Sequence, residues 1–341
     1  MRHDYLHEPE TGRLVAAPGS DLGAVWTDLL APTPEEEAAV ELELGIDLPT
    51  RDEMRGIEPS ARIYSENGIQ FLTANVLAGA DTPDPVMEPV TFVLTQSRVV
   101  TIRYHRPYSL SNVPQRAAGM QADCTTPIRM LMTLMEVMVD RGGDILEAES
   151  RRLDLLSRQI FQPAVAGKAR GARGVDLSAV IAQIGHHGEL NSRLQDSLVT
   201  IERIVSHMAQ MRLSAHRELA AAADGQVPAP HHQALGLNGR DKRLLRDITS
   251  LIDYAEAQSH RVSFMLEATL GLLNIQQNGI IKIFSVAAVV FLPPTLIASI
   301  YGMNFARMPE LAAPYGYPLA LGAMVLSAIL PYLFFKRKGW L

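Results

Sequence analysis

Hydrophobic and polar residues alternate over the first hundred positions in short runs rich in β-branched side chains, a pattern typical of strands. Two of these runs, Ala61–Ser65 and Ile69–Val76, flank Glu66-Asn67-Gly68, and an Asn-Gly pair between strands favours a tight hairpin turn. The other predicted strands are Ala24–Leu29, Val90–Thr95 and Arg98–Tyr104. The pattern therefore predicts a small α/β domain in this part of the chain.

One helix of that domain is predicted from its end signals. Thr33-Pro34-Glu35-Glu36 places a hydroxyl at the N-cap, a proline at the first helical position and a carboxylate that reaches back to the cap. We expect the helix to end at Gly45, because glycine readily adopts the left-handed conformation that follows many last turns.

From about Pro127 the spacing of apolar residues changes to three or four, as a helix requires. The first long helix begins there, and an exposed turn is predicted over Pro163–Gly174. A second helix is expected over about Asp176–Ala222, followed by a proline- and glycine-containing linker, Asp224–Gly239. The third begins near Asp241 and meets no clear stop before Tyr301-Gly302, so its sixty or so residues would span roughly 90 Å.

The end of this third helix is wholly apolar. Ile283–Tyr301 and Tyr317–Phe335 are each nineteen residues long and contain no charged side chain. A bilayer core of about 30 Å is crossed by ~20 apolar residues. The sequence therefore predicts two membrane-spanning helices near the C-terminal end.

The distribution of basic residues predicts the orientation of these spans. Lys336-Arg337-Lys338 directly follows the second span, whereas the loop between the spans has only Arg307, balanced by Glu310. Because basic residues concentrate on the cytoplasmic side, we expect the C-terminus in the cytoplasm, and two spans then place the N-terminus there as well. The first residues also lack the apolar stretch of a secretory signal, which agrees with that orientation.

The chain of 341 residues is too long for one ordinary core, and we divide it into six segments. The fold class is an α/β cytoplasmic domain plus long helices and two C-terminal transmembrane helices. The segments are a cytoplasmic α/β domain (1–125), a cytoplasmic helical region (126–239), a long stalk helix that ends in the first span (240–303, with the span at about 280–301), an external loop (304–316), the second span (317–335) and a basic cytoplasmic tail (336–341).

Composition and missing motifs exclude several classes of function. The net charge of −6 argues against a nucleic-acid partner, and the single cysteine, Cys124, excludes an internal disulfide. No phosphate-binding glycine-rich loop or catalytic metal motif occurs, so we expect neither an enzyme nor an ATPase partner. The histidine pairs His186-His187 and His231-His232 do not predict a metal site, because adjacent residues on a helix face different directions and the second pair lies in the linker.

One face of the first span is marked by residues that recur every three or four positions. This stripe is polar at its start, apolar through its middle and weakly polar again toward Tyr301, and it consists of Asn278, Ile281, Phe284 (or Ser285), Ala288, Leu292, Thr295 and Ser299. Lipid does not favour such a stripe, whereas an aqueous pore or a helix–helix interface does. No Asp or Glu occurs between Glu267 and Glu310, so a pore here would have a neutral lining, which suits a cation that keeps its water shell. With two spans per chain, a pore also requires a homo-oligomer.

The residues between the spans carry a resemblance. Tyr301-Gly302-Met303-Asn304-Phe305, followed by Met308-Pro309-Glu310-Leu311 in the external loop, resembles the signature of the CorA magnesium/cobalt transporter family. Asn274–Asn278, Phe291–Leu296 and Lys336–Leu341 are similar to that family's span entry, span middle and tail. The resemblance extends over the chain and is strongest from about Arg246 onward.

This resemblance implies a funnel-shaped homopentamer in the inner membrane that takes up hydrated Mg²⁺, and also Co²⁺ and Ni²⁺. Gly302, Met303 and Asn304 would form the outer selectivity ring, and the stripe would line the pore. Mg²⁺ would also bind between cytoplasmic domains and close the channel. Glu267 matches one acidic position of that kind, and Glu66 is the partner that we consider with it.

Two other functions stay open. The zinc transporters of the ZntB branch share the Gly-Met-Asn triplet, although the residues Met308–Leu311 and the neutral lining favour magnesium. A membrane-anchored sensor that conducts no ion is the other alternative, and it would not require the stripe.

Overall fold

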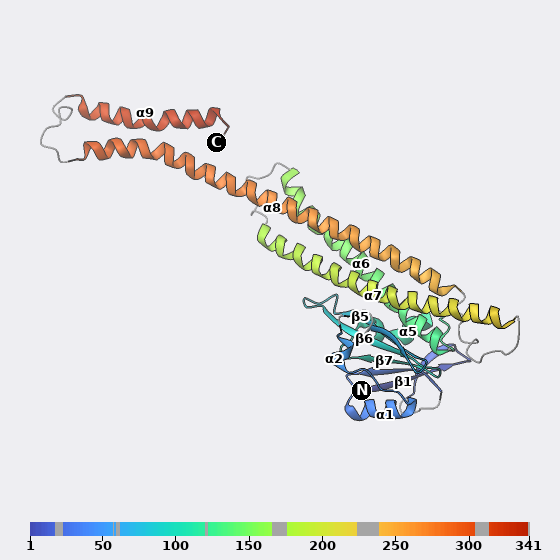
Figure 1. The fold of residues 1–341 in the computed structure, drawn as a ribbon. Coiled ribbons are helices and arrows are strands. Elements are labelled where there is room, and N and C mark those ends of the chain that lie inside the picture. The colour runs from blue at the N-terminus through green and yellow to red at the C-terminus, as the bar shows by residue number, and fades with distance from the viewer. Residues whose placement is uncertain are drawn as a thin grey trace. The chain divides into compact units, whose positions relative to one another are not determined.

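The computed structural model describes residues 1–17, 23–56, 58, 62–119, 122–165, 176–223, 239–303 and 314–339 (Figure 1). They form two compact units, Met1–Met265 and Leu266–Leu341. The linker 224–238, residues 166–175 of the predicted turn, and 304–313 of the predicted external loop lie outside the described residues.

The first unit contains a seven-stranded sheet in the part of the chain that the structure describes, with the order β2-β1-β3-β7-β6-β5-β4. Strands β3 and β7 are parallel, and the other neighbouring pairs are antiparallel. The strands are β1 (Arg2–Glu8), β2 (Arg13–Ala16), β3 (Ala24–Leu30), β4 (Ile63–Glu66), β5 (Ile69–Ala78), β6 (Val86–Leu94) and β7 (Val99–Arg103). The predicted strands are thus confirmed, whereas β1 and β2 were not expected.

The hairpin between β4 and β5 has the predicted turn. Asn67 and Gly68 both have positive φ, 50° and 81°. Two successive positive φ values are what a tight hairpin turn needs to match the twist of its strands, and asparagine and glycine tolerate them best.

One face of the sheet is covered by short helices with polar caps. Helix α1 (Pro34–Leu44) has the predicted capping box between Thr33 and Glu36, and it ends at Gly45 in the left-handed conformation. Helix α2 (Arg51–Met54) has a second capping box, at Thr50 and Glu53. The buried residues of these helices and of the segment between them pack against one face of the sheet. The small core that results consists of Leu29, Val40, Leu48, Met54, Phe71, Val93, Val100 and Ile102.

The opposite face carries the larger core, which the sheet shares with long helices. These elements are α4 (Tyr108–Ser111), α5 (Val113–Gly119), α6 (Pro127–Val165), α7 (Leu177–Ala223) and the first part of α8 (Arg240–Tyr301). The apolar face predicted for α6 is buried and includes Leu131, Met132 and Met135. The turn predicted from Pro163 is wrong at its start, because α6 remains helical through Val165.

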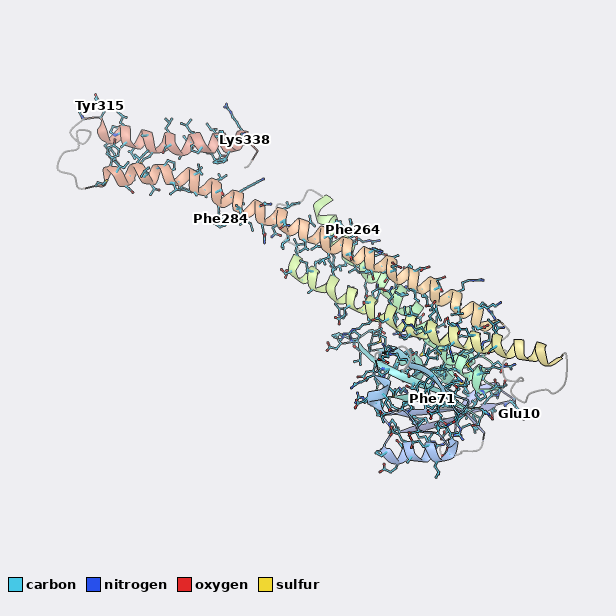
Figure 2. The ribbon with its side chains drawn as sticks, viewed as in Figure 1. Glu10, Phe71, Phe264, Phe284, Tyr315 and Lys338 are labelled. Atoms are coloured by element: carbon cyan, nitrogen blue, oxygen red, sulfur yellow. The ribbon has the colours of Figure 1, made fainter. Side chains whose placement is uncertain are left out.

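The second unit consists of the remainder of α8 and of α9 (Gly316–Arg337), which returns antiparallel to it (Figure 1). By length and composition, α8 and α9 are the two described helices that could cross a membrane, and 6% and 0% of their apolar windows are buried within the chain. Pro293 and Pro294 lie inside α8, and Pro331 lies inside α9. The side chains of this unit are drawn in Figure 2, with Phe284 and Tyr315 labelled.

Candidate pore-lining face and external ring

The seven residues of the predicted stripe all lie on the membrane part of α8, and all of them are exposed in the single chain. The exposed fractions are 60% for Ile281, 71% for Phe284 and 65% for Leu292. Large apolar side chains that remain this accessible require lipid, another chain or a lumen around them.

The covered face of α8 lies on the other side of the helix. Val286 is only 6% exposed, and Gly279, Val290, Pro293 and Ile297 are partly covered at spacings of three, four or seven residues. A step of two residues, as from Ala288 to Val290, turns about 200° around a helix of 3.6 residues per turn. Packing within the second unit therefore occupies the face opposite the stripe and leaves the stripe accessible.

The covered face of α9 is built mainly from small residues. Gly316, Ala320, Met324, Ala328 and Pro331 recur every three or four positions and are covered, while most of the residues between them are exposed. Small residues allow helix backbones to approach closely in a membrane. A helix–helix interface was the alternative explanation for the stripe of α8. Helix α9 has such an interface, and it is built from small residues.

The proline pair changes the polarity of the span at its middle. Pro293 and Pro294 have no N–H group, so the carbonyl groups of Val289 and Val290 lose their intrahelical donors. One residue later, the Thr295 hydroxyl donates a hydrogen bond to the Phe291 carbonyl oxygen at 2.7 Å. Because its hydrogen is used in this bond, the Thr295 hydroxyl offers only an oxygen that accepts hydrogen bonds. The water molecules around a cation point their hydrogen atoms outward and therefore require such acceptors.

Two backbone hydrogen bonds hold the C-terminal end of α8. The N–H of Gly302 donates to the Ala298 carbonyl at 3.0 Å, and that of Met303 donates to the Ile300 carbonyl at 3.3 Å. A Cβ atom at Gly302 would lie 3.2 Å from the Ala298 oxygen, which is a tight contact with backbone. Glycine fits this position best. Asn304, Met308, Pro309, Glu310 and Leu311 lie outside the described residues.

The two residues expected to regulate transport belong to different units. Glu66 is exposed at the end of β4 in the first unit, and Glu267 is exposed on α8 in the second. Among the residues that the structure describes, no group of three or more His, Cys, Asp or Glu side chains is placed to hold a metal ion.

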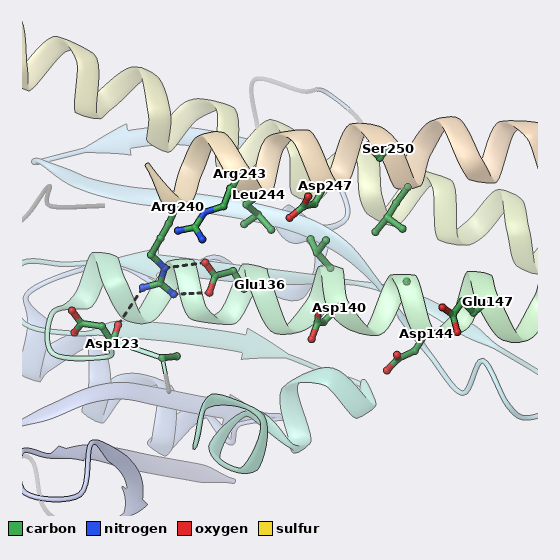
Figure 3. A pocket seen from close by; sticks show the side chains of 14 residues that line it. Asp123, Glu136, Asp140, Asp144, Glu147, Arg240, Arg243, Leu244, Asp247 and Ser250 are labelled. Carbon is green, nitrogen blue, oxygen red and sulfur yellow. Dashed lines mark hydrogen bonds and ion pairs between the residues drawn. The ribbon is translucent and has the colours of Figure 1, made fainter. Parts of the chain in front are cut away.

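A feature that the sequence did not predict is an acidic groove between α6 and α8 in the first unit, with a cavity of about 770 Å³. Figure 3 shows Arg240 of α8 reaching Glu136 of α6, and the two side chains form bonds of 2.9 and 2.6 Å. This contact raises the pKa of Arg240. The carboxylates farther along the groove are Asp140, Asp144, Glu147 and Asp247. These carboxylates place negative charge on both helices. The spacing of residues along the sequence could not predict this groove, because the groove depends on how α6 and α8 pack.

Comparison with known proteins identifies the family. The profile of the "CorA-like Mg2+ transporter protein" family matches residues 21–337. The chain belongs to this family. The chain is 32% identical over 338 residues to the magnesium transport protein CorA of Yersinia pseudotuberculosis, covering 98% of both chains. It is 33% identical over 327 residues to that of Salmonella typhimurium, covering 94% of this chain and 93% of the relative.

Solved structures show the same fold. The complete structure of the CorA magnesium transporter from Methanocaldococcus jannaschii superposes with a TM-score of 0.69 at 17% identity, covering 100% of this chain and 99% of that one. The full-length CmaX protein gives a TM-score of 0.63 at 17% identity, covering 99% and 97%. The architecture of an α/β domain, long helices and two C-terminal apolar helices is thus that of CorA. Membership of the family makes this chain a membrane transporter of metal ions.

Proposed function

We propose that this CorA-family chain forms a passive channel that takes up hydrated Mg²⁺, and also Co²⁺ and Ni²⁺, through a pore lined by α8. The observation that carries the proposal is the accessible stripe from Asn278 to Ser299, which leads directly to Gly302 and Met303. Its full-length relatives are named magnesium transport proteins, which supports Mg²⁺ as the main ion.

The chemistry of the stripe fits an ion that keeps its water. Mg²⁺ releases its water reluctantly, and its shell presents hydrogen atoms outward. The Asn278 amide oxygen, the Thr295 hydroxyl oxygen and the Asn304 amide oxygen are neutral acceptors for such a shell. Ile281, Phe284 and Leu292 supply an apolar stretch between them, and apolar constrictions can close a pore by excluding water.

The driving force in this proposal is electrical. An inside-negative potential contributes about 2.3 kcal/mol per charge for each 100 mV, and a divalent ion gains twice that amount. For the potential to drive uptake, the chain must be oriented in the membrane. In the proposed orientation both termini lie in the cytoplasm, and Lys336, Arg337 and Lys338 lie at the inner surface of the plasma (inner) membrane.

The proposed pore is shared by several copies of the chain. Two spans cannot enclose a lumen, and packing with α9 covers only the face of α8 opposite the stripe. A homo-oligomer, a pentamer by the family resemblance, would bring the stripes of several chains around one axis. Gly302, Met303 and Asn304 would then form its external ring, followed by the loop residues Met308, Pro309, Glu310 and Leu311.

We also propose feedback by intracellular Mg²⁺. Mg²⁺ that binds carboxylates of neighbouring subunits would relieve their repulsion and favour a closed arrangement, and its release would favour opening. Glu267 is the first candidate because it lies on α8, the helix that continues into the pore. Glu66 is the second candidate.

The decisive experiment is ion flux into liposomes that contain the purified full-length chain, with Mg²⁺, Co²⁺, Ni²⁺ and Zn²⁺ compared side by side. We expect Mg²⁺ uptake that is lost in Asn304→Ala and kept in Ser327→Ala, a matched control whose hydroxyl bonds its own helix at Met324. Full flux through Asn304→Ala would remove the ring from the mechanism. Preference for Zn²⁺ would favour the zinc-transporter alternative, and absence of any flux would favour the sensor.

A further inference from the structure

In the second unit, the faces by which α8 and α9 pack on each other both continue into a lysine. Lys282 lies four residues before the buried Val286 and eleven before Pro293, so helical spacing places it on the covered row of α8. Lys338 lies seven residues after Pro331, which is about two helical turns, and it continues the covered row of α9. Both lysines are themselves exposed. Each packed face therefore ends in an accessible positive charge.

The two lysines lie at about the same level of the second unit. Helix α8 ends at Tyr301, and α9 begins at Gly316 and returns antiparallel, so residues equally far from these two ends are level with each other. Lys282 and Lys338 are each roughly 30 Å from these ends, at a rise of 1.5 Å per residue. Figure 2 accordingly shows Phe284, which closely follows Lys282, and Lys338 at the same end of the unit. Packing thus brings like charges together from two helices.

The positions next to these lysines have no side chain. Gly279 lies three residues before Lys282 on the same row, and Gly339 directly follows Lys338. Apart from adjacent residues and the backbone of its own helix, no described atom lies within 4 Å of the place that a Cβ would take at either glycine. A small group therefore has room to approach both lysines.

The charge at this end of the unit is strongly positive. Lys336 and Arg337 add two further cations, and Glu310, in the connection between the spans, is the only acidic residue from position 268 to position 341. Basic residues in the last turn of a helix interact favourably with its dipole, which accounts for those at the end of α9. The dipole does not account for Lys282, because this residue lies in the interior of α8.

Apolar side chains adjoin the charges on the side toward the connection between the helices. The exposed fractions are 66% for Ile283 of α8, and 58% for Leu330 and 57% for Phe334 of α9. A ligand that fits both features has a negative head and apolar chains that begin beside it. An acidic phospholipid has this distribution, whereas a free phosphate ion has no use for the apolar surface.

We propose that Lys282 and Lys338 bind the phosphate of an acidic phospholipid, whose acyl chains lie along the exposed apolar residues of α8 and α9. In the orientation proposed above this lipid belongs to the inner leaflet, and that placement rests on the proposed function, whereas the binding itself does not. Basic pockets between membrane helices on the cytoplasmic side bind acidic headgroups in this way. The bound phosphate offsets the repulsion between the two lysines and so stabilises the packing of α9 on α8 at this end.

The site is tested with the purified full-length chain in phosphatidylcholine vesicles that contain either dibrominated phosphatidylglycerol or dibrominated phosphatidylcholine. Bromine quenches tryptophan fluorescence on contact. Trp340 follows Lys338 by two residues in the sequence and reports on lipid here, whereas Trp26 is fully buried in the first unit and gives a constant background. We expect the wild type to prefer phosphatidylglycerol by about tenfold or more, because each basic residue contributes a factor of about five.

The variants separate a site from general attraction by the basic residues. Lys282→Gln and Lys338→Gln should each lower the preference about fivefold, and Lys282→Arg should keep it. Arg337→Gln is the matched control. It removes the same charge from the neighbouring position, but helical spacing turns this residue about 120° away from the row of Pro331, so the preference should change less than twofold. Quenching by dibrominated phosphatidylcholine should be equal in all variants, which shows that each one is inserted.

Three results would overturn the site. They are a wild type without preference, a preference that persists in Lys282→Gln, and equal losses in Arg337→Gln and Lys338→Gln, which would indicate diffuse attraction only. Competition by inorganic phosphate would also overturn it, because the ligand would then be a free anion. If the chain shows no Mg²⁺ flux, the proposed function fails, while the quenching data still decide the lipid site.

Discussion

The ion pair between Asp28 and Arg103 should be one of the most sensitive points of the first unit. The two side chains are 3% and 4% exposed and lie on the parallel strands β3 and β7. Arg103 donates through Nε to Asp28 Oδ1 at 3.0 Å and through Nη2 to Asp28 Oδ2 at 2.7 Å, and the Thr101 hydroxyl donates to Asp28 Oδ1 at 2.7 Å. Removing the negative charge would leave a buried guanidinium without its counter-charge.

The size of the effect follows from these contacts. Breaking a buried pair by removing one partner costs about 3–5 kcal/mol. Asp28→Asn keeps one oxygen acceptor for Thr101 and Arg103, so we expect about 3 kcal/mol, at the lower end of that range. With a denaturant slope of about 3 kcal/mol/M, the urea midpoint should fall by about 1 M.

The assay uses the intrinsic fluorescence of Trp26. Its indole N–H donates to the Thr101 hydroxyl at 3.0 Å within the same sheet, so its signal follows the unfolding of this region. Trp340 is the only other tryptophan of the chain, and a Trp340→Phe background makes the signal specific. The full-length protein in detergent is titrated with urea at neutral pH.

Two controls make the result interpretable. Glu147→Gln removes an exposed partner of Arg151, with 75% and 68% of the two side chains accessible, and it should change stability by no more than about 0.5 kcal/mol. Asp28→Asn combined with Arg103→Gln removes both charges and should recover part of the loss. A loss below about 1 kcal/mol in the single variant, or no recovery in the double variant, would refute the reasoning about the buried charge.

Three further predictions concern the pore, the sensor and the acid limit of stability. Leu292→Ser places a hydroxyl in the apolar part of the stripe and should increase Mg²⁺ leak at high internal Mg²⁺ in liposomes; an unchanged leak would place the constriction elsewhere. Glu267→Lys should shift the Mg²⁺ midpoint of protease protection of the first unit to higher concentration, and an identical midpoint would leave Glu267 as a surface charge. Burial acts to raise the pKa of Glu149, a residue of α6, but its hydrogen bonds with His187 of α7 and with Arg152 outweigh burial and lower that pKa from 4.5. The stabilisation by Glu149 is therefore complete above 4.5 and is lost as the pH falls through the lower native pKa. Glu149→Gln should therefore flatten the acid side of the thermal stability curve, and an equal acid slope in both proteins would contradict this.

Features that depend on neighbouring residues could be predicted from the sequence. The capping box at Thr33 and the turn at Asn67-Gly68 each satisfy local backbone geometry, so a few residues determine them. The two apolar helices follow from length and composition, because a bilayer core imposes both on any spanning segment. The stripe on α8 follows from helical period alone. Its role as a pore lining stays a prediction, as do the six segment boundaries and the roles of Glu66 and Glu267.

Contacts between distant residues were decided by the tertiary structure. Strand β1 was missed because most of its side chains are polar, and it is held by pairing with β3 rather than by an apolar pattern of its own. Strand β2 was missed because it is only four residues long, and it is held by pairing with β1. Asp28 and Arg103 are 75 positions apart, and Glu149 and His187 are 38 apart. No residue in either pair signals its partner locally, because the register of β3 against β7 and the packing of α6 against α7 bring them together. Burial then strengthens the contacts within each pair, because a hydrogen bond in the low-dielectric interior does not compete with water.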